Sequence, residues 1–223
     1  MGIKAIIFDL DNTLYAEKDY IELVAKEIAR LLVGRTYYTE EAISNKFINI
    51  FEKTGDKNIF QNLLNELELD YDGISELIEC YRNVKGDIKL YSDAQDILDF
   101  KGKYKLGIIT NGGVYTQNNK IKLLNIQEKF DSIVITGEKF LKHEWKPHYK
   151  PYKYITDELQ VSVEECLFVG DRIETDILGA LGVGMKAILV DRSKKVGIQK
   201  IQCRSKMYYM VNSLSKITQI LEE

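Results

Sequence analysis

Two aspartates, Asp9 and Asp11, lie two positions apart where the first apolar run of the chain ends. Residues two apart point to the same side of an extended strand, but the end of the run favours a turn. A turn would let Asp9 project from the strand end while Asp11 curls back toward it. Two carboxylates and a freed backbone carbonyl could then share one hard metal ion.

A second polar group follows a later apolar run. Thr110, Asn111 and Gly112 end a predicted strand and directly precede a predicted helix. A hydroxyl, small side chains and backbone amides at a helix N-terminus suit a phosphate group. An ordinary turn with a helix cap is the alternative interpretation of the same residues.

Two further acids and a lysine complete the candidate chemistry. Asp171 ends another predicted strand, and Asp176 follows at the start of a helix, where it could also serve as a helix cap. Lys146 and Lys150 each precede a proline in the loop 143–151, and either could be an ordinary solvated loop residue. Acid pairs, a hydroxyl and a lysine are nevertheless complementary parts of a single site.

The elements that must position these residues alternate between strand and helix. Hydrophobic periodicity predicts strands at 3–8, 105–110, 132–136, 166–170 and 186–190, a weak strand at 207–211, and helices at 92–101, 115–124, 152–159, 175–181 and 214–221. This order predicts an α/β fold, a Rossmann-like parallel sheet with helices on both faces. Ligands bind beyond the carboxyl ends of such strands, where the polar residues lie. We expect the basic segment 192–206 to be a solvated connection.

Residues 16–85 differ in character from the rest. Apolar residues recur at helical spacing in 19–32, 39–51, 58–67 and 73–82. The sequence therefore predicts two domains, a catalytic core formed by 1–15 and 86–223 and an all-helical insert at 16–85. Tyr20, Arg30 and Tyr81 in the insert are candidate substrate contacts, or surface and core residues of the insert.

Composition excludes several classes of function. The 223 residues are 45% hydrophobic, carry a net charge of −3 and have no block of basic residues, so we expect neither nucleic-acid nor membrane binding. Three scattered cysteines favour a reducing compartment, and with no long apolar stretch or leader we expect a cytoplasmic protein. Small ligands are the expected partners, and the oligomeric state is left open.

The motifs resemble those of the haloacid dehalogenase-like (HAD) hydrolase superfamily over nearly the whole chain. That family carries DxDxT, then Thr or Ser, then a lysine, then GDxxxxD, which match residues 9–13, Thr110, Lys146 and residues 170–176. The family's lysine opens a Lys–Pro segment at a fixed distance before a Val–Ser pair, and Lys146 has that distance whereas Lys150 does not. His148 stands where relatives often have an acid.

The resemblance implies roles for these residues. Asp9 would be the nucleophile that forms an aspartyl-phosphate, and Asp11 the general acid and base. Asp9, the Asp11 carbonyl and Asp171 would hold Mg²⁺, with Asp176 in a second shell that orients waters or Lys146. The remaining groups, Lys146, the Thr110 hydroxyl and the amides of Asn111 and Gly112, would bind phosphate oxygens.

The resemblance also implies a reaction class. Dehalogenases of the family carry tyrosine where Asp11 stands, so an acid there favours phosphoester chemistry. We expect a magnesium-dependent phosphatase of small phosphomonoesters, whether sugar phosphates, triose phosphates or nucleoside monophosphates, with the insert as a specificity cap. A phosphomutase that transfers the phosphoryl group between sugar hydroxyls is the alternative, and a non-enzymatic binding domain is a third hypothesis.

Overall fold

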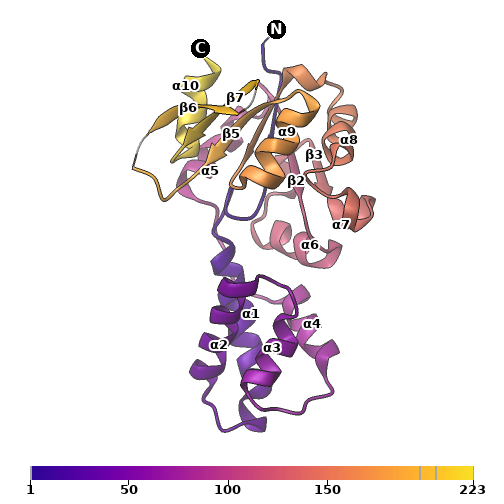
Figure 1. The fold of residues 1–223 in the computed structure, drawn as a ribbon, viewed down its shortest axis with the longest axis vertical. Coiled ribbons are helices and arrows are strands. Elements are labelled where there is room, and N and C mark those ends of the chain that lie inside the picture. The colour runs from indigo at the N-terminus through magenta and orange to yellow at the C-terminus, as the bar shows by residue number, and fades with distance from the viewer. Residues whose placement is uncertain (1, 196, 204, 223) are drawn as a thin grey trace. The chain divides into compact units, whose positions relative to one another are not determined.

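A computed structural model describes residues 2–195, 197–203 and 205–222 (Figure 1). The chain divides into two compact units, one formed by Met1–Ala16 with Lys89–Glu223 and the other by Glu17–Ile88. We call them the sheet unit and the helical unit. The first connection between them follows the first acidic motif closely in sequence, after residue 16, and the second lies between residues 88 and 89.

The sheet unit contains a seven-stranded sheet in the order β3-β2-β1-β4-β5-β7-β6. Its strands are β1 (Ala5–Phe8), β2 (Lys105–Thr110), β3 (Ser132–Ile135), β4 (Cys166–Gly170), β5 (Lys186–Val190), β6 (Ile198–Cys203) and β7 (Lys206–Val211). All neighbouring strands pair parallel except β6 and β7, which are antiparallel. The prediction of an α/β fold with a mostly parallel sheet is confirmed.

Helices cover this sheet. They are α5 (Ser92–Ile97), α6 (Val114–Leu123), α7 (Thr136–Lys139), α8 (Tyr149–Leu159), α9 (Leu178–Val183) and α10 (Ile217–Leu221). Residues of α8 and α9 pack with Ile7 and Phe168 in one hydrophobic core. Ile6 and Phe8 point to the opposite face and are also fully buried. The central strands are therefore covered on both faces, as their apolar sequences require.

The register brings the functional strand ends to one edge. Phe8 of β1 lies opposite Ile108 of β2 on one side and Val169 of β4 on the other. Because the three strands are parallel, the residues that follow them emerge at the same edge. The two acidic motifs and Thr110 therefore share this edge of the sheet.

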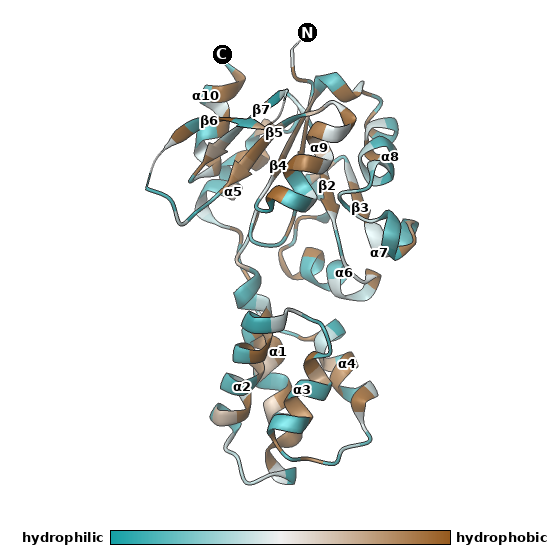
Figure 2. Ribbon diagram, in the orientation of Figure 1, coloured by the Kyte–Doolittle hydropathy of each residue, from teal (hydrophilic) through white to brown (hydrophobic). Residues whose placement is uncertain are grey.

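The helical unit contains α1 (Glu17–Leu32), α2 (Glu40–Thr54), α3 (Ile59–Glu66) and α4 (Ile74–Asn83). Its helices carry hydrophobic and hydrophilic residues on different sides (Figure 2), and the buried residues of α1 recur at helical spacing. The Tyr20 ring packs edge-on against Tyr81 at 6.1 Å and its hydroxyl donates to the Tyr81 carbonyl at 2.5 Å. Tyr20 is thus a core residue of the helical unit.

Two local predictions differ from the structure. The segment 192–206 is not only a connection, because β6 forms within it and pairs with β7. The helix predicted at 152–159 begins earlier, at Tyr149. The Nδ1 atom of His148 caps this helix, because it accepts a hydrogen bond from the Lys150 backbone amide at 3.3 Å. His148 therefore has a structural role at the start of α8. No helix among the described residues combines the length and apolar character needed to cross a membrane.

Candidate active site

The first acidic motif is a tight turn at the end of β1. The Asp9 amide donates to the Val169 carbonyl at 2.9 Å, which extends the pairing of β1 with β4 by one residue. Asn12 then takes a left-handed conformation, with φ 58°, which asparagine tolerates better than most residues. The turn leaves Asp9 nearly buried, at 7% exposure, at the edge of the sheet. The sequence predicted a turn at this point.

Lys146 points at the first aspartate. Its Nζ donates to Asp9 at 2.5 Å and to Asp176 at 2.7 Å, and its side chain is 1% exposed. Asn111 fixes the backbone of Lys146, because its side chain accepts from the Lys146 amide and donates to the Lys146 carbonyl, both at 3.0 Å. Lys150, the other candidate, forms an ion pair with Glu144 instead. The geometry thus separates two lysines that local sequence left equivalent.

The second acidic motif adds two carboxylates beside Asp9. Single carboxylate oxygens of Asp9, Asp171 and Asp176 all lie within 4.8 Å of one another. The other oxygen of Asp176 accepts the Arg172 amide at 3.0 Å. Gly170 permits this approach, since a Cβ there would lie 2.5 Å from the Cβ of Asp176. We refer to Asp9, Asp171, Asp176 and Lys146 as the Asp9 cluster.

The Asp9 cluster holds more negative than positive charge. Burial raises the pKa of Asp9 well above its usual range, and Asp176 and Asp171 raise it further against the opposing effect of Lys146. Burial and Asp176 raise the pKa of Asp171 to about 7. Burial alone would lower the pKa of Lys146, but its two carboxylate partners raise it above its usual value, so Lys146 stays charged. The two shifted acids share one physical cause, which is crowding of carboxylates in a buried place.

This donor set fits a hard divalent cation. The three acids supply oxygen ligands only, and the raised pKa values of Asp9 and Asp171 reflect burial and electrostatic repulsion, which a bound cation would offset. Mg²⁺ binds through one or two carboxylates and keeps several waters, so the cluster has more than enough ligands for it. Asp176 is already engaged by Lys146 and the Arg172 amide, which leaves Asp9 and Asp171 as the more available carboxylates.

Asp11 has a different set of partners. We refer to Asp11, Lys120, Tyr15 and Gln117 as the Asp11 cluster. Its Oδ1 accepts from Lys120 at 2.7 Å and from the Tyr15 hydroxyl at 2.5 Å, and its Oδ2 accepts from Gln117 at 2.9 Å. Gln117 also donates to Thr110 at 2.5 Å. Gln117 and Lys120 lie on α6 and are each only 2% exposed.

These partners act together on the Asp11 carboxyl. Burial would raise the pKa of Asp11, but the Lys120 charge and the hydrogen bonds from Lys120, Tyr15 and Gln117 outweigh it and lower the pKa. Asp11 is therefore ionised in this structure. Sequence reasoning did not single out Gln117, Lys120 or Tyr15. The available signal was the presence of polar residues at 117 and 120 on the same helical face as Ile121 and Leu124.

The turn between β2 and α6 lies at the same edge. Thr110 is 1% exposed, and because it accepts from Gln117 its own hydroxyl hydrogen remains for another acceptor. Gly112 adopts φ 151°, where a side chain would be strained, and the N-cap Gly113 has no side chain to cap α6. Backbone amides at such a helix start can bind an anion.

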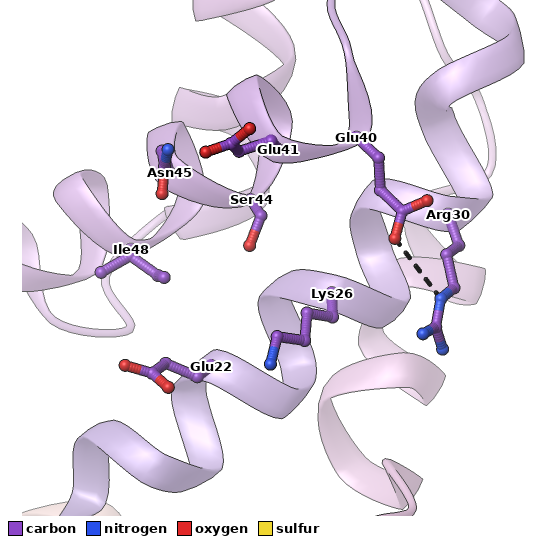
Figure 3. Close-up of a pocket in the computed structure, with 8 residues that line it drawn as sticks. All are labelled: Glu22, Lys26, Arg30, Glu40, Glu41, Ser44, Asn45 and Ile48. Atoms are coloured by element: carbon purple, nitrogen blue, oxygen red, sulfur yellow. Dashed lines mark ion pairs between the residues drawn. The ribbon is translucent and has the colours of Figure 1, made fainter.

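Each unit contains a pocket among its described residues. In the sheet unit a pocket of about 520 Å³ opens beside Asp171 and is also lined by Asn12, Tyr91, Arg172 and Arg192. In the helical unit a groove of about 660 Å³ lies between α1 and α2 (Figure 3). Arg30 lines this groove and pairs with Glu40 at 3.5 Å, which accounts for its charge.

Comparison with known proteins places the chain in a family. Residues 6–190 match the family model described as haloacid dehalogenase-like hydrolase. The chain is 31% identical over 229 residues to glyceraldehyde 3-phosphate phosphatase of Methanocaldococcus jannaschii, covering 99% of this chain and 97% of that protein. It is 28% identical over 239 residues to human N-acylneuraminate-9-phosphatase, covering 99% and 94%.

Solved structures agree with this placement. A HAD phosphatase from Thermococcus onnurineus superposes with a TM-score of 0.65 at 25% identity, covering 98% of each chain. The magnesium-bound HAD-hydrolase YfnB from Bacillus subtilis has the same fold, with a TM-score of 0.70 at 20% identity over 100% of both chains. Its named relatives are phosphatases, which makes the chain a phosphoric monoester hydrolase. The chain belongs to the haloacid dehalogenase-like hydrolase family.

Proposed function

We propose that the protein is a magnesium-dependent phosphatase that hydrolyses small phosphomonoesters through an aspartyl-phosphate on Asp9. The observation that carries the proposal is the buried Asp9 carboxylate, which faces Lys146 at 2.5 Å at the carboxyl edge of a parallel sheet. Carboxylates are established nucleophiles in phosphoryl transfer, and burial removes the water that would weaken attack.

Lys146 would neutralise part of the charge that accumulates during attack. Its side chain stays charged and contacts Asp9, so it can also reach an oxygen of a phosphate held against Asp9. Asp176 would act through Lys146, because its 2.7 Å contact keeps the ammonium in place. We assign Lys146 a catalytic and phosphate-binding role and Asp176 a supporting one.

The metal would be held by the Asp9 carboxylate, the Asp11 backbone carbonyl and the Asp171 carboxylate. Bound there, Mg²⁺ would offset the charge of the carboxylates and of the phosphate that they surround. The crowding of Asp9, Asp171 and Asp176 supports the assignment, since their oxygens already lie within 4.8 Å of one another.

Asp11 would transfer protons. It would protonate the leaving alcohol oxygen and then accept a proton from the water that hydrolyses the intermediate. The lowered pKa of Asp11 suits the second step, in which it acts as a base. For the first step Asp11 must gain a proton, which the negative charge of an arriving phosphate favours.

Phosphate oxygens would be held by the strand end of β2. The Thr110 hydroxyl has a hydrogen available for donation, and the amides of Asn111 and Gly112 lie in the turn that starts α6. Together with Lys146, these donors would form one binding site for the phosphate group.

The substrate would be a small metabolite. The pocket beside Asp171, of about 520 Å³, is in the range of small-molecule sites. Triose phosphates and sugar phosphates, including sugar acids, are the first candidates because named relatives act on glyceraldehyde 3-phosphate and N-acylneuraminate 9-phosphate; nucleoside monophosphates are the next. We further propose that the helical unit is the specificity cap, and that the enzyme is cytoplasmic, as its free Cys80, Cys166 and Cys203 favour.

A screen of phosphorylated metabolites with Mg²⁺, scored by phosphate release, tests the proposal. We expect Asp9→Asn to lower kcat on the best substrate by about 10⁵-fold, because the nucleophile is lost. Asp157→Asn, an exposed change on α8, is the matched control and should leave the rate unchanged. Turnover retained by Asp9→Asn with metal present would refute the assignment. Isomerised sugar phosphate in excess over free phosphate would instead indicate the phosphomutase.

A further inference from the structure

We propose that Lys120 and Gln117 are positioning residues that hold the Asp11 carboxyl in the orientation required for proton transfer. The inference rests on the proposed phosphatase function and concerns two residues of α6 that lie outside the four motifs. Both are 2% exposed, and both donate to the side chain of Asp11.

Lys120 is held by its contact with Asp11. Its side chain is 3% exposed, that of Asp11 is 16% exposed, and 2.7 Å separate Nζ from Oδ1. Lysine is rarely buried to this extent unless it is paired, because removing an ammonium group from water is costly. A buried lysine at this position therefore needs specific partners, and Asp11, the proposed acid and base, is one of them.

The whole carboxyl group of Asp11 is fixed by donors. Lys120 and the Tyr15 hydroxyl bind Oδ1, while the amide of Gln117 binds Oδ2 at 2.9 Å. Rotation about the Cβ–Cγ bond of Asp11 would break contacts on both oxygens. The donors thus define the plane of the carboxyl group, and the two that come from α6 set it relative to the sheet.

Gln117 also relates Asp11 to the phosphate site. One amide nitrogen has two hydrogens, and Nε2 of Gln117 donates to Asp11 at 2.9 Å and to Thr110 at 2.5 Å. The Gln117 side chain therefore bridges Asp11, the proposed proton donor, and the Thr110 hydroxyl, which is assigned to phosphate binding. Gly112 leaves room for it, since a Cβ there would lie 2.9 Å from Cγ of Gln117.

The consequence depends on the leaving group. An alkyl alcohol is a poor leaving group unless its oxygen is protonated in the transition state, whereas a nitrophenolate leaves without a proton. The ratio kcat/KM reports the steps up to phosphoryl transfer to Asp9, whereas the later action of Asp11 as a base is common to both substrates. Misplacing Asp11 should therefore lower kcat/KM for alkyl phosphates much more than for aryl phosphates. A residue that only stabilised the fold would slow both substrates to a similar extent.

The test compares Lys120→Met with Lys120→Arg and with Lys122→Met, an exposed change on the same helix. We expect Lys120→Met to lower kcat/KM on glycerol phosphate by about 100-fold and on nitrophenyl phosphate by less than about tenfold. Lys120→Arg keeps a buried cation and should recover at least about tenfold of the loss on glycerol phosphate. Lys122→Met should match the wild type on both substrates.

Gln117→Met provides a second variant of similar size, which carries the test if Lys120→Met does not fold. We expect about a tenfold loss of kcat/KM on glycerol phosphate and a smaller loss on nitrophenyl phosphate. Equal losses on the two substrates in the folded variants, or no loss at all, would overturn the inference while the wild type and Asp9→Asn still report on the phosphatase function. A wild type that releases phosphate from neither compound nor from any metabolite of the screen would overturn both.

Discussion

Asp9 and Asp11 are two residues apart, yet the structure compensates their charges in different ways. Asp9 shares the Lys146 ammonium with Asp176 and also has Asp171 nearby. Asp11 has the Lys120 ammonium as a partner of its own, together with neutral donors from Tyr15 and Gln117. Three carboxylates surround one lysine in the Asp9 cluster, and one carboxylate faces one lysine in the Asp11 cluster.

The pKa values follow this difference. Burial and acidic neighbours raise the pKa of Asp9, whereas the Lys120 charge and three hydrogen bonds overcome burial and lower the pKa of Asp11. The Asp9 cluster is therefore short of positive charge and is suited to receive a cation. The Asp11 cluster is balanced and complete without one, which suits a group that must keep a fixed orientation.

The largest expected effect that tests this difference between the two clusters is on the stability of the metal-free protein. Asp11→Asn removes the carboxylate that lies 2.7 Å from the buried Lys120 ammonium, and we expect a loss of about 3 kcal/mol in the free energy of unfolding. Asp171→Asn removes one of three mutually repelling carboxylates, and we expect a gain of about 1 kcal/mol. Urea unfolding in the presence of a chelator measures both changes.

The opposite signs are the informative part of that experiment. Asp157→Asn, at an exposed position, gives the baseline for removing a carboxylate with no buried partner. If Asp171→Asn destabilises the metal-free protein as strongly as Asp11→Asn does, the Asp9 cluster has no excess of negative charge and the contrast between the two clusters is wrong.

Magnesium binding should sharpen the same comparison. At about a hundredfold excess over its dissociation constant, Mg²⁺ should stabilise the wild type by about 2.7 kcal/mol. Asp171→Asn should lose most of this gain because it removes a proposed ligand. Asp11→Asn should keep it, because only the backbone carbonyl of Asp11 is assigned to the metal. Thermal unfolding with and without Mg²⁺ measures the gain, and full protection of Asp171→Asn would remove that residue from the ligand set.

The sequence predicted the Asp9 cluster better than the Asp11 cluster. Asp9, Asp171 and Thr110 each follow a continuous apolar strand, so the parallel fold itself brings them to one edge. Lys146 comes from a loop, and only the resemblance distinguished it from Lys150. What selects it in the structure is the Asn111 side chain, which holds the Lys146 backbone from β2, a contact between residues 35 positions apart.

The Asp11 cluster was missed because its α6 partners interrupt a hydrophobic face. Gln117 and Lys120 occupy buried positions on the face that also holds Ile121. Because the buried and exposed faces of this helix differ little in hydrophobicity, its sequence does not show that these two polar residues are buried. The strand β6 was missed for a related reason. It is an edge strand whose residues are half-buried or exposed, so its sequence lacks the apolar run that identified the central strands.

A third ion pair provides a balanced reference for the Asp11 cluster. Asp93 on α5 accepts from Arg192 at 2.9 and 3.1 Å, from the Ser213 hydroxyl at 2.7 Å and from the Leu214 amide at 2.9 Å. It resembles Asp11 in having a cation as a partner, but within the described parts of the chain no hydrogen bond or ion pair joins it to a residue of the Asp9 cluster. Its partner Arg192 lines the pocket beside Asp171, so Asp93→Asn should affect stability and substrate binding and leave proton transfer by Asp11 unchanged.

Asp93→Asn should produce the smallest of these effects, and its pH dependence has a definite sign. Burial would raise the pKa of Asp93, but its hydrogen bonds from Arg192, Ser213 and Leu214 outweigh burial and lower it. A lowered pKa in the folded state contributes stability above the unfolded value of about 3.9, and this contribution is lost as the pH falls through the folded value. We expect Asp93→Asn to cost about 1.5 kcal/mol at pH 7, and the difference from the wild type to shrink below about pH 4.

Asp96→Asn, an exposed change on the same helix, should show neither the loss nor the pH dependence. Denaturant unfolding across this pH range measures both, and kcat on the best substrate should stay within about twofold of the wild type in each variant. If Asp93→Asn instead lowered kcat as Asp11→Asn does, a balanced ion pair outside the Asp9 and Asp11 clusters would control the chemistry. The fixed orientation of Asp11 would then not be what distinguishes its cluster from an ordinary structural pair.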